Sequence, residues 1–380
     1  MSGFISGTSA SRASRTIRPR TDPSWSACSE KGHCNLPGAQ PLVSVIIPAW
    51  NAGATLAETL RSVAAQTYGN LEIIIVDDGS VDETAALARE FCANDARARL
   101  VSRKNGGSAA ARNLGIGQAK AQWIALIDAD DLWHPTKIEK QVSVALAAAE
   151  PPGFVYCWYR KIDRDGFVIG SGPRWSEQGS AFLPLAYLHF IRGGSSLLLS
   201  KSAFAEAGGY DESFREGCED VVLELEIARR RPVAVVPEFL FGYRAHSSNF
   251  TRDFDLLQNG WRRAFAALRD RAGLPGKLVR QVNAQRSVAI AVQRAVERRP
   301  RESVKAALKA LVLDPLRSGL SLAGTAVSVA SRRLRGRSMG VIRRHFDNVD
   351  PTERLDADSN PIFALVDRLD ARRMRRFAKS

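Results

Sequence analysis

The sequence predicts an α/β fold with a mostly parallel central sheet, followed by a basic helical extension. Three observations lead to this prediction. Short, β-branched apolar runs alternate four times with segments of helical periodicity between residues 42 and 150, which is typical of a parallel sheet covered by helices. Shorter strand-like and helical segments follow to about residue 250. Beyond them only helical periodicity continues, and residues 251–380 hold 28 Lys and Arg against 13 Asp and Glu, an excess of 15.

These patterns divide the chain of 380 residues into three parts. Residues 1–40 are rich in Ser, Arg and Pro and have no apolar period, so we expect a disordered amino-terminal arm. Residues 41–250 should form the α/β domain, and residues 251–380 the helical extension.

The α/β domain opens with the run LVSVIIP at 42–48, which is typical of a strand buried on both faces. Leu56, Leu60 and Val63 then share one face of a helix. The two patterns repeat, and Ser80 and Glu83 match a capping box that would start the second helix. The expected strands lie at 42–48, 71–80, 98–103 and 123–128, and the expected helices at 55–66, 82–92, 109–119 and 135–149.

The regular alternation ends after residue 150. Residues 154–169 resemble a hairpin with an Asp165-Gly166 turn. The expected elements that follow are a strand at 193–201, an amphipathic helix at 219–231 and a strand at 232–237.

Polar residues follow each of the first four predicted strands. The most acidic group is DADD, in which Asp128, Asp130 and Asp131 follow the apolar run WIALI. Because ligands of open parallel sheets bind beyond the carboxyl ends of the strands, these groups should meet at one edge. Such crowded carboxylates need a cation, and oxygen ligands favour Mg²⁺ or Mn²⁺ held together with substrate phosphates. Asp131 has a second interpretation as a cap for the helix predicted at Pro135.

Other nucleotide-binding classes are disfavoured. The chain has no G-x-x-x-x-G-K-[ST] loop and no G-x-G-x-x-G after the first strand. Asp77 and Asp78 end the second strand, where they could accept hydrogen bonds from a base or ribose, and Gly79 allows close backbone approach. Arg112 could contact a phosphate or base, or balance the acidic cluster, and the sequence leaves this choice open.

Four segments together resemble one known family. They are PLVSVIIPAWNAGATLAETLRSVAAQTYGNLEIIIVDDGSVDET, NGGSAAARNLGI, IALIDADDLWHP and GGYDESFREGCEDVVLELEIARR. In this order they resemble the family 2 glycosyltransferases of the GT-A fold, over about residues 41–250. Trp50 departs from the Tyr of many members. The Q-x-x-R-W signature is absent, which argues against a processive, membrane-embedded synthase.

The resemblance implies a nucleotide-diphospho-sugar donor, most often a UDP-sugar, and Mn²⁺ or Mg²⁺ as cofactor. Asp128 and Asp130 match the D-x-D motif, the first near the ribose and the second on the metal. The nucleotide-sugar site would be completed by Pro48, Ala49, Trp50, Asp77, Asp78 and Arg112. The acceptor would be a hydroxyl of a glycan or of a lipid-linked compound in cell-surface polysaccharide or glycolipid synthesis.

In the same resemblance, Asp220 matches the catalytic base, and direct attack inverts the anomeric configuration. Glu219 is the second choice for the base, with pairing to Arg215 or helix capping as its structural alternative. His246 matches a position near the diphosphate in some members. A sugar nucleotidyltransferase is an alternative function, although PAWNAGATL lacks the basic residue expected of one. A non-catalytic glycan- or membrane-binding module is another.

The basic extension has three interpretations: a helical region packed on the catalytic domain, an attachment to an anionic membrane surface, or a nucleic-acid-binding region, which we disfavour because no known motif is present. In ESVKAALKALVLD, the apolar residues of one helix face lie beside Lys305 and Lys309. These apolar residues are Val304, Ala307, Leu308, Leu311 and Val312. The five scattered cysteines and the lack of a long apolar run predict a cytoplasmic protein without a transmembrane helix, with the inner membrane face as a further location.

Overall fold

The computed structural model describes residues 40–214, 217–245, 254–334, 344–353 and 361–378. The predicted arm therefore lies outside the described residues, apart from Gln40. The chain from Pro41 onward forms one compact unit.

The core of this unit is a nine-stranded sheet in the order β3-β2-β1-β4-β8-β6-β9-β5, with β7 paired to β6. The strands are β1 (Val43–Ala49), β2 (Leu71–Asp77), β3 (Ala98–Ser102), β4 (Trp123–Leu126), β5 (Leu132–Trp133), β6 (Phe154–Ile162), β7 (Val168–Ser171), β8 (Leu198–Ser200) and β9 (Val233–Arg244). The four predicted amino-terminal strands are confirmed, and they pair with one another in parallel. β8 is antiparallel to β4 and β6, which makes the whole sheet mixed.

Apolar side chains on both faces of the sheet are buried, as the continuous apolar runs predict. Within β1, Ile46 belongs to one hydrophobic cluster, whereas Val45 and Ile47 belong to the other. This alternation follows from the two-residue period of a strand. β1 lies between β2 and β4, so the loop after it is flanked by the ends of both neighbours.

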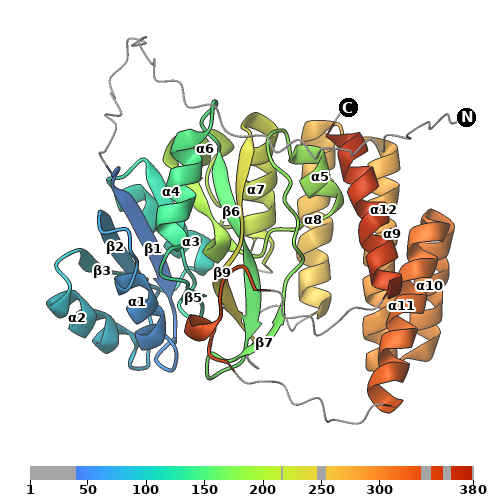
Figure 1. Ribbon diagram of the computed structural model, residues 1–380, viewed down its shortest axis with the longest axis horizontal. Helices are drawn as coiled ribbons and strands as arrows, with labels where there is room; N and C mark the ends of the chain where they lie inside the picture. The colour runs from blue at the N-terminus through green and yellow to red at the C-terminus, as the bar shows by residue number, and fades with distance from the viewer. Residues whose placement is uncertain (1–39, 215–216, 246–253, 335–343, 354–360, 379–380) are drawn as a thin grey trace, which may run out of the picture. The chain divides into compact units, whose positions relative to one another are not determined.

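The helices between the strands cover both faces (Figure 1). They are α1 (Leu56–Ala64), α2 (Thr84–Asn94), α3 (Ser108–Gln118), α4 (Lys137–Ala147), α5 (Phe182–Tyr187), α6 (Lys201–Ala207) and α7 (Glu219–Arg230). The capping box predicted at Ser80 and Glu83 is wrong. The α2 helix begins at Thr84 without a side-chain cap, because the Ser80 hydroxyl instead accepts a hydrogen bond from the backbone of Asn51.

The second half of the α/β part matches the prediction at the hairpin and at α7, the helix expected at 219–231, but it differs elsewhere. The helices α5 and α6 were not predicted, and β9 continues to Arg244, beyond the strand expected at 232–237. The hairpin is confirmed as β6 and β7, with Gly166 at a φ of 81° in its turn. The strand expected at 193–201 is shorter, because Gly194–Ser196 forms a 3-10 turn before β8.

Five helices form the carboxyl-terminal extension and pack beside the sheet-containing part (Figure 1). They are α8 (Phe254–Ala272), α9 (Gly276–Val296), α10 (Pro300–Leu313), α11 (Pro315–Leu334) and α12 (Pro361–Phe377). Asp370 on α12 accepts a hydrogen bond from the Tyr187 hydroxyl at 2.5 Å and forms an ion pair with Arg317 at 2.8 Å. These groups are buried, so the extension is anchored to α5 by satisfied polar contacts. Among the described helices, none is both long and apolar enough to cross a membrane.

Candidate active site

The loops that follow β1 and β2 are hydrogen-bonded to each other. Asn51 has a φ of 48°, in the left-handed region that Asn tolerates. Its Oδ1 accepts a hydrogen bond from the N–H of Val81 at 3.0 Å, and its own N–H donates to the Ser80 hydroxyl at 3.0 Å. The neighbouring Trp50 side chain is 58% exposed. The structure thus presents a flat indole ring on a tethered loop at the open edge of the sheet.

Asp78 shapes the loop between β3 and α3. Its carboxylate accepts hydrogen bonds from the N–H groups of Gly106 at 3.0 Å and Gly107 at 2.8 Å, and it pairs with Arg103 Nε at 3.1 Å. The residue is 3% exposed. A carboxylate that receives several N–H donors orders its surroundings, so Asp78 links the end of β2 to the start of α3.

Asp77 and Gly79 complete this corner. Asp77 is buried, and its Oδ1 accepts a hydrogen bond from the N–H of Ser80 at 3.0 Å. Gly79 has a φ of 76°, and a Cβ atom there would lie 2.9 Å from the backbone nitrogen of Asn105. Only glycine fits both the backbone angle and the close approach. The ends of β2 and β3 are consequently in backbone contact.

Arg112 joins the end of β4 to the start of α7. Its guanidinium donates to Asp128 Oδ1 at 2.6 Å and to Glu219 Oε1 at 2.8 Å, and Glu219 also accepts from the Ser108 hydroxyl at 2.7 Å. The sequence left open whether Arg112 contacts a ligand or balances the acidic cluster. In the structure its guanidinium forms ion pairs with two carboxylates. Glu219 pairs with Arg112; Arg215, the partner expected from the sequence, lies outside the described residues.

We expect Arg112→Ala to lower the free energy of unfolding by about 3–5 kcal/mol, because it leaves Glu219 buried without its cation. The guanidinium is only 8% exposed. The matched control is Arg97→Ala, whose pair with Asp95 lies nearer the surface, with Arg97 32% exposed, and should cost at most about 1 kcal/mol. Urea unfolding of both variants measures the difference, and equal losses would contradict the expectation.

Asp131 has a structural role that the sequence did not reveal. It is buried, and its two oxygens accept hydrogen bonds from the Ser195 hydroxyl at 2.6 Å and from the N–H of Arg244 at 3.0 Å. The interpretation of Asp131 as a helix cap is wrong, since α4 begins at Lys137 and Thr136 occupies the cap position. Asp131 instead connects the DADD segment to β9 and to the turn before β8.

The remaining carboxylates of this segment, Asp128 and Asp130, are partly exposed. Burial, and then the charges of Asp130 and Asp128, raise the pKa of Asp131 well above its ordinary value, which reflects how crowded the negative charge is. Among the described residues, no group of three or more His, Cys, Asp or Glu side chains could hold a metal ion. A divalent ion here would need further oxygens from a substrate, the usual arrangement for Mg²⁺ beside phosphates. The donor set fits such an ion.

Asp220 lies in the first turn of α7 and is partly exposed. One turn further along the helix, the buried Glu224 carboxylate is 2.7 Å from Nε2 of the partly buried His189. Burial raises the pKa of Asp220, the charge of Glu224 raises it further, and His189 opposes the rise. A carboxyl group with a raised pKa is better matched to proton abstraction near neutral pH than an ordinary one.

The raised pKa of Asp220 predicts how turnover depends on pH. If Asp220 must be ionised to act, the rate should fall as the pH drops through its raised pKa. The acidic limb should therefore lie above the range of an ordinary Asp. His189→Gln retains a donor for Glu224 but removes a positive charge, so the limb should move to higher pH. A pH–rate profile of both proteins, with circular dichroism at each pH to confirm folding, checks this; an acidic limb at the ordinary Asp pKa would rule it out.

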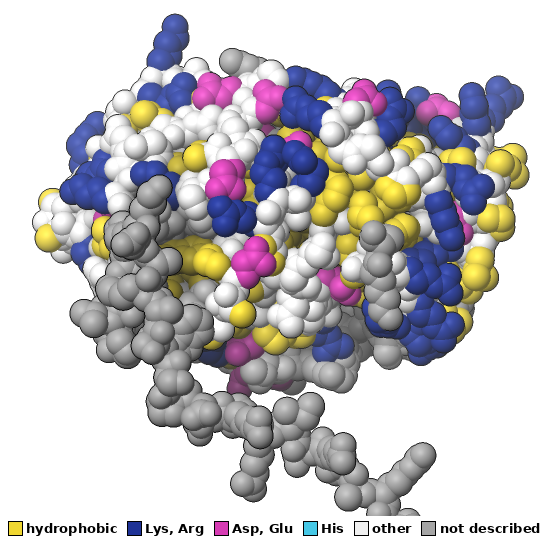
Figure 2. Space-filling view, turned by 90° about the horizontal axis from the view of Figure 1, so that it is seen from above, with side chains coloured by type: hydrophobic (Ala, Val, Ile, Leu, Met, Phe, Trp, Pro, Cys, Tyr) yellow, Lys and Arg dark blue, Asp and Glu magenta, His cyan; other side chains and the backbone are white. Residues whose placement is uncertain are grey.

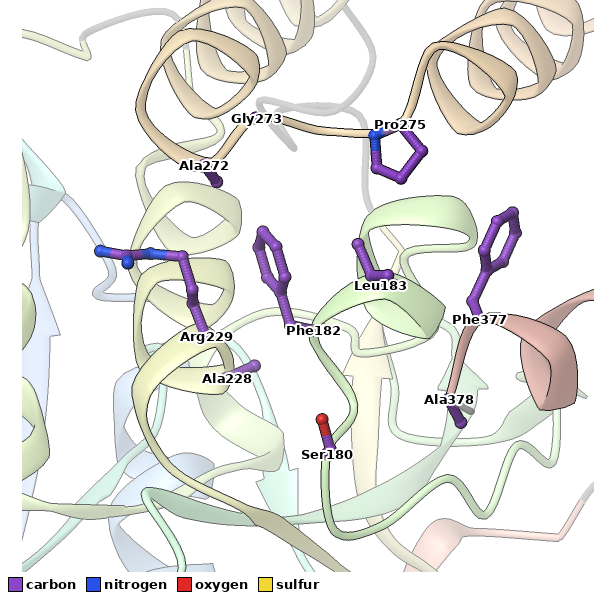
Figure 3. A pocket seen from close by; sticks show the side chains of 10 residues that line it. All are labelled: Ser180, Phe182, Leu183, Ala228, Arg229, Ala272, Gly273, Pro275, Phe377 and Ala378. Atoms are coloured by element: carbon purple, nitrogen blue, oxygen red, sulfur yellow. The ribbon is translucent and has the colours of Figure 1, made fainter. Parts of the chain in front are cut away.

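A separate pocket of about 380 Å³ lies away from these carboxylates. Figure 3 shows its lining by Phe182 and Leu183 of α5, the α8–α9 connection, and Phe377 near the end of α12. It meets α7 at Ala228 and Arg229, nine residues and roughly 13 Å along the helix from Asp220. This pocket is therefore distinct from the strand-end site.

Comparisons with known proteins agree with this geometry. A family model described as "Glycosyl transferase family 2" matches residues 44–206. An uncharacterized glycosyltransferase of Rickettsia typhi is 32% identical over 214 residues, covering 56% of this chain and 66% of that protein. A chondroitin synthase of Escherichia coli is 29% identical over 217 residues, covering 55% of this chain but only 30% of the synthase. A crystal structure of S. aureus TarS residues 1–349 in complex with UDP-GlcNAc superposes with a TM-score of 0.53 at 17% identity, covering 74% of this chain and 83% of that TarS fragment.

The protein is accordingly a glycosyltransferase with a GT-A-type fold. More narrowly, the chain belongs to the family 2 glycosyltransferases. Membership of this family decides against the sugar nucleotidyltransferase that the sequence had left as an alternative.

The structure gives roles at the site that sequence reasoning missed. They belong to Ser80, Ser195, Arg244, Glu224 and His189. Ser80 and Glu224 lie in segments that the sequence marked, but the contacts of all five residues span long stretches of sequence and could not be read from a local pattern. His246, which the resemblance placed near the diphosphate, lies outside the described residues.

Proposed function

We propose that the protein is a metal-dependent, inverting, non-processive glycosyltransferase that moves a sugar from a nucleotide-diphospho-sugar to a hydroxyl group. The acceptor is a glycan or a lipid-linked compound in cell-surface polysaccharide or glycolipid synthesis. The observation that carries this proposal is the Arg112 bridge. It joins Asp128 at the end of β4 to Glu219 at the start of α7, beside the proposed base, Asp220. The Arg112 guanidinium therefore lies between Asp128, which belongs to the donor site, and the start of α7, which carries the proposed base.

On the donor side, the nucleotide lies against the β1 and β2 ends. Pro48, Ala49 and the exposed Trp50 provide the surface for the base, and Asp77 and Asp78 form the wall beside it. Asp78 acts by ordering the Gly106-Gly107 loop, and its acceptor capacity is already used there. Asp128 faces the ribose and is held by its ion pair with Arg112. Arg112 also offers positive charge close to the phosphates.

Asp130 is the proposed metal ligand, with Mn²⁺ or Mg²⁺ as the ion. The bound ion would neutralise the leaving diphosphate as a Lewis acid. Asp128 and Asp130, which are partly exposed, would provide carboxylate oxygens, while both oxygens of the buried Asp131 accept hydrogen bonds within the protein. The segment therefore separates one buried structural carboxylate from two that face outward.

On the acceptor side, Asp220 accepts the proton of the attacking hydroxyl. Glu219 is less suited to this role because Arg112 and Ser108 already occupy one of its oxygens. Attack on the face opposite the leaving diphosphate inverts the anomeric carbon in a single displacement. One base is then sufficient, and no covalent sugar–protein intermediate forms.

We propose a UDP-sugar as the donor, and a cytoplasmic location with peripheral contact to the inner membrane face. UDP-GlcNAc, present in the TarS crystal structure, belongs in the first panel of donors. The chondroitin synthase relative supports testing oligosaccharide acceptors. A calorimetric screen of UDP-, GDP- and dTDP-sugars with and without Mn²⁺ tests the proposal. Uptake of one donor that strengthens with Mn²⁺ is expected; no uptake of any donor would refute it.

A further inference from the structure

Helix α10 exposes a row of large apolar side chains to solvent. Val304, Leu308 and Val312 are 57%, 59% and 81% exposed, and we refer to these three residues as the apolar stripe. Their spacing of four residues places them along one side of the helix. Single exposed apolar residues are common on protein surfaces, but a continuous row indicates a contact surface.

The stripe is not the face by which α10 joins the fold. Ala306 and Ala310 are buried instead, and α10 packs on α9 and α11. Two further apolar side chains flank the helix, Val296 before it at 74% exposure and Leu316 after it at 61%. Exposed apolar side chains thus occur on α10 and on the helices that precede and follow it in the sequence.

A row of cations runs beside the stripe. Arg301, Lys305 and Lys309 are exposed and follow the same four-residue spacing, offset by about 60° around the helix from the apolar stripe. Within the described parts of the chain, these three side chains form no ion pair. Figure 2 shows yellow hydrophobic and dark blue basic side chains intermixed along its right-hand edge, the end at which Figure 1 places α10.

We propose that α10 docks on the surface of an anionic lipid bilayer. Apolar side chains on one side of a helix enter the interface between headgroups and acyl chains, while adjacent Lys and Arg pair with lipid phosphates. The excess of 15 positive charges in residues 251–380 provides attraction over a longer range. This inference rests on the proposed function, because a lipid-linked acceptor would be reached from such a surface.

The test measures binding of the full chain to sedimented vesicles of phosphatidylglycerol or of phosphatidylcholine. We expect binding to the anionic vesicles only, weakened by raising the salt concentration. Lys305→Gln/Lys309→Gln should weaken it about 30-fold, from roughly 1 kcal/mol for each basic residue. Leu308→Ser/Val312→Ser should weaken it more than about tenfold through lost apolar burial.

Matched controls carry the same chemical changes elsewhere. Arg89→Gln/Lys120→Gln removes two exposed charges from the α/β part, and Leu146→Ser/Ile169→Ser removes two apolar side chains that are 44% and 53% exposed. Both controls should bind vesicles like the unmodified chain. The proposal is overturned if the controls lose as much binding as the α10 variants, or if no anionic vesicle is bound at low salt.

Two further measurements separate this proposal from its alternatives. If the stripe instead joined two copies of the chain, Leu308→Ser/Val312→Ser would convert a dimer to a monomer in analytical ultracentrifugation without changing vesicle binding, which would also overturn it. Hydrolysis of the donor sugar in the absence of vesicles should be the same in the α10 variants and the unmodified chain. If no donor is hydrolysed but vesicle binding follows the expected pattern, the proposed function fails and the docking surface stands.

Discussion

Asp220→Asn should abolish sugar transfer while leaving donor binding nearly unchanged. The amide cannot accept the proton of an attacking hydroxyl, and general base catalysis is worth about 10²–10⁴-fold in rate. Asp220 lies at the start of α7, across Arg112 from the proposed donor groups, and its raised pKa suits proton abstraction. We therefore expect turnover to fall by about 10³-fold with donor affinity altered by less than about threefold. Turnover assays and calorimetric donor titration measure the two quantities.

The control for this variant is Glu226→Gln, which changes a carboxylate on the same helix. Glu226 pairs with Arg229 and Arg230, away from the site, so turnover of the correctly folded variant should be nearly normal. Near-normal turnover of Asp220→Asn would remove Asp220 from the mechanism. A deep loss in Glu219→Gln without unfolding would transfer the role of base to Glu219.

Much of the fold was predictable because one physical pattern repeats. A strand buried on both faces needs a nearly continuous apolar run, and 42–48 and 71–76 show one, interrupted only by Ser44 and Glu72. The polar groups after these runs were predictable for the same reason, since parallel strands place their carboxyl ends at one edge. The structure brings Asn51 and Ser80, at the ends of β1 and β2, into contact.

Roles set by distant contacts were not predictable. Asp131 and Asp130 are adjacent acidic residues in the sequence, yet Asp131 is buried because Ser195 and Arg244, far along the chain, supply its hydrogen bonds. Ser80 fits a local capping pattern, but Asn51 from another loop binds its hydroxyl. Local rules describe what a side chain can do, and tertiary contacts select among the possibilities.

The extension shows the same limit. Packing on the catalytic domain was one of three interpretations of its charged sequence, but the sequence did not identify the buried pair of Asp370 and Arg317 that anchors α12 and α11 near Tyr187. Some of the acidic and basic residues therefore serve packing. The apolar stripe of α10 behaves oppositely, since a period that usually marks a core face lies exposed in the structure. The sequence correctly predicted helices in this region, but it did not predict which helix faces are buried and which are exposed.

Substitutions of the adjacent residues Asp130 and Asp131 give the sharpest test of which carboxylate binds the metal ion. Asp130→Asn should eliminate the gain in donor affinity on adding Mn²⁺ and lower kcat/KM by about 10³-fold, since metal neutralisation of a leaving group is worth several kcal/mol. Its stability should change little, because the Asp130 side chain is partly exposed. Calorimetry with and without Mn²⁺, together with urea unfolding, measures both effects.

Asp131→Ala provides the contrast, because it should affect stability first. It removes the acceptor of two buried donors, Ser195 Oγ and the N–H of Arg244, at about 1–3 kcal/mol for each. The unfolding free energy should fall by about 2–6 kcal/mol, while the folded fraction retains a Mn²⁺-dependent gain in donor affinity. If instead Asp130→Asn keeps the Mn²⁺ effect and Asp131→Ala loses it without destabilisation, then the buried carboxylate is the ligand and the two roles are reversed. In that case the hydrogen bonds of Asp131 would not mark it as the structural residue, and the exposure of Asp130 would not mark it as the metal ligand.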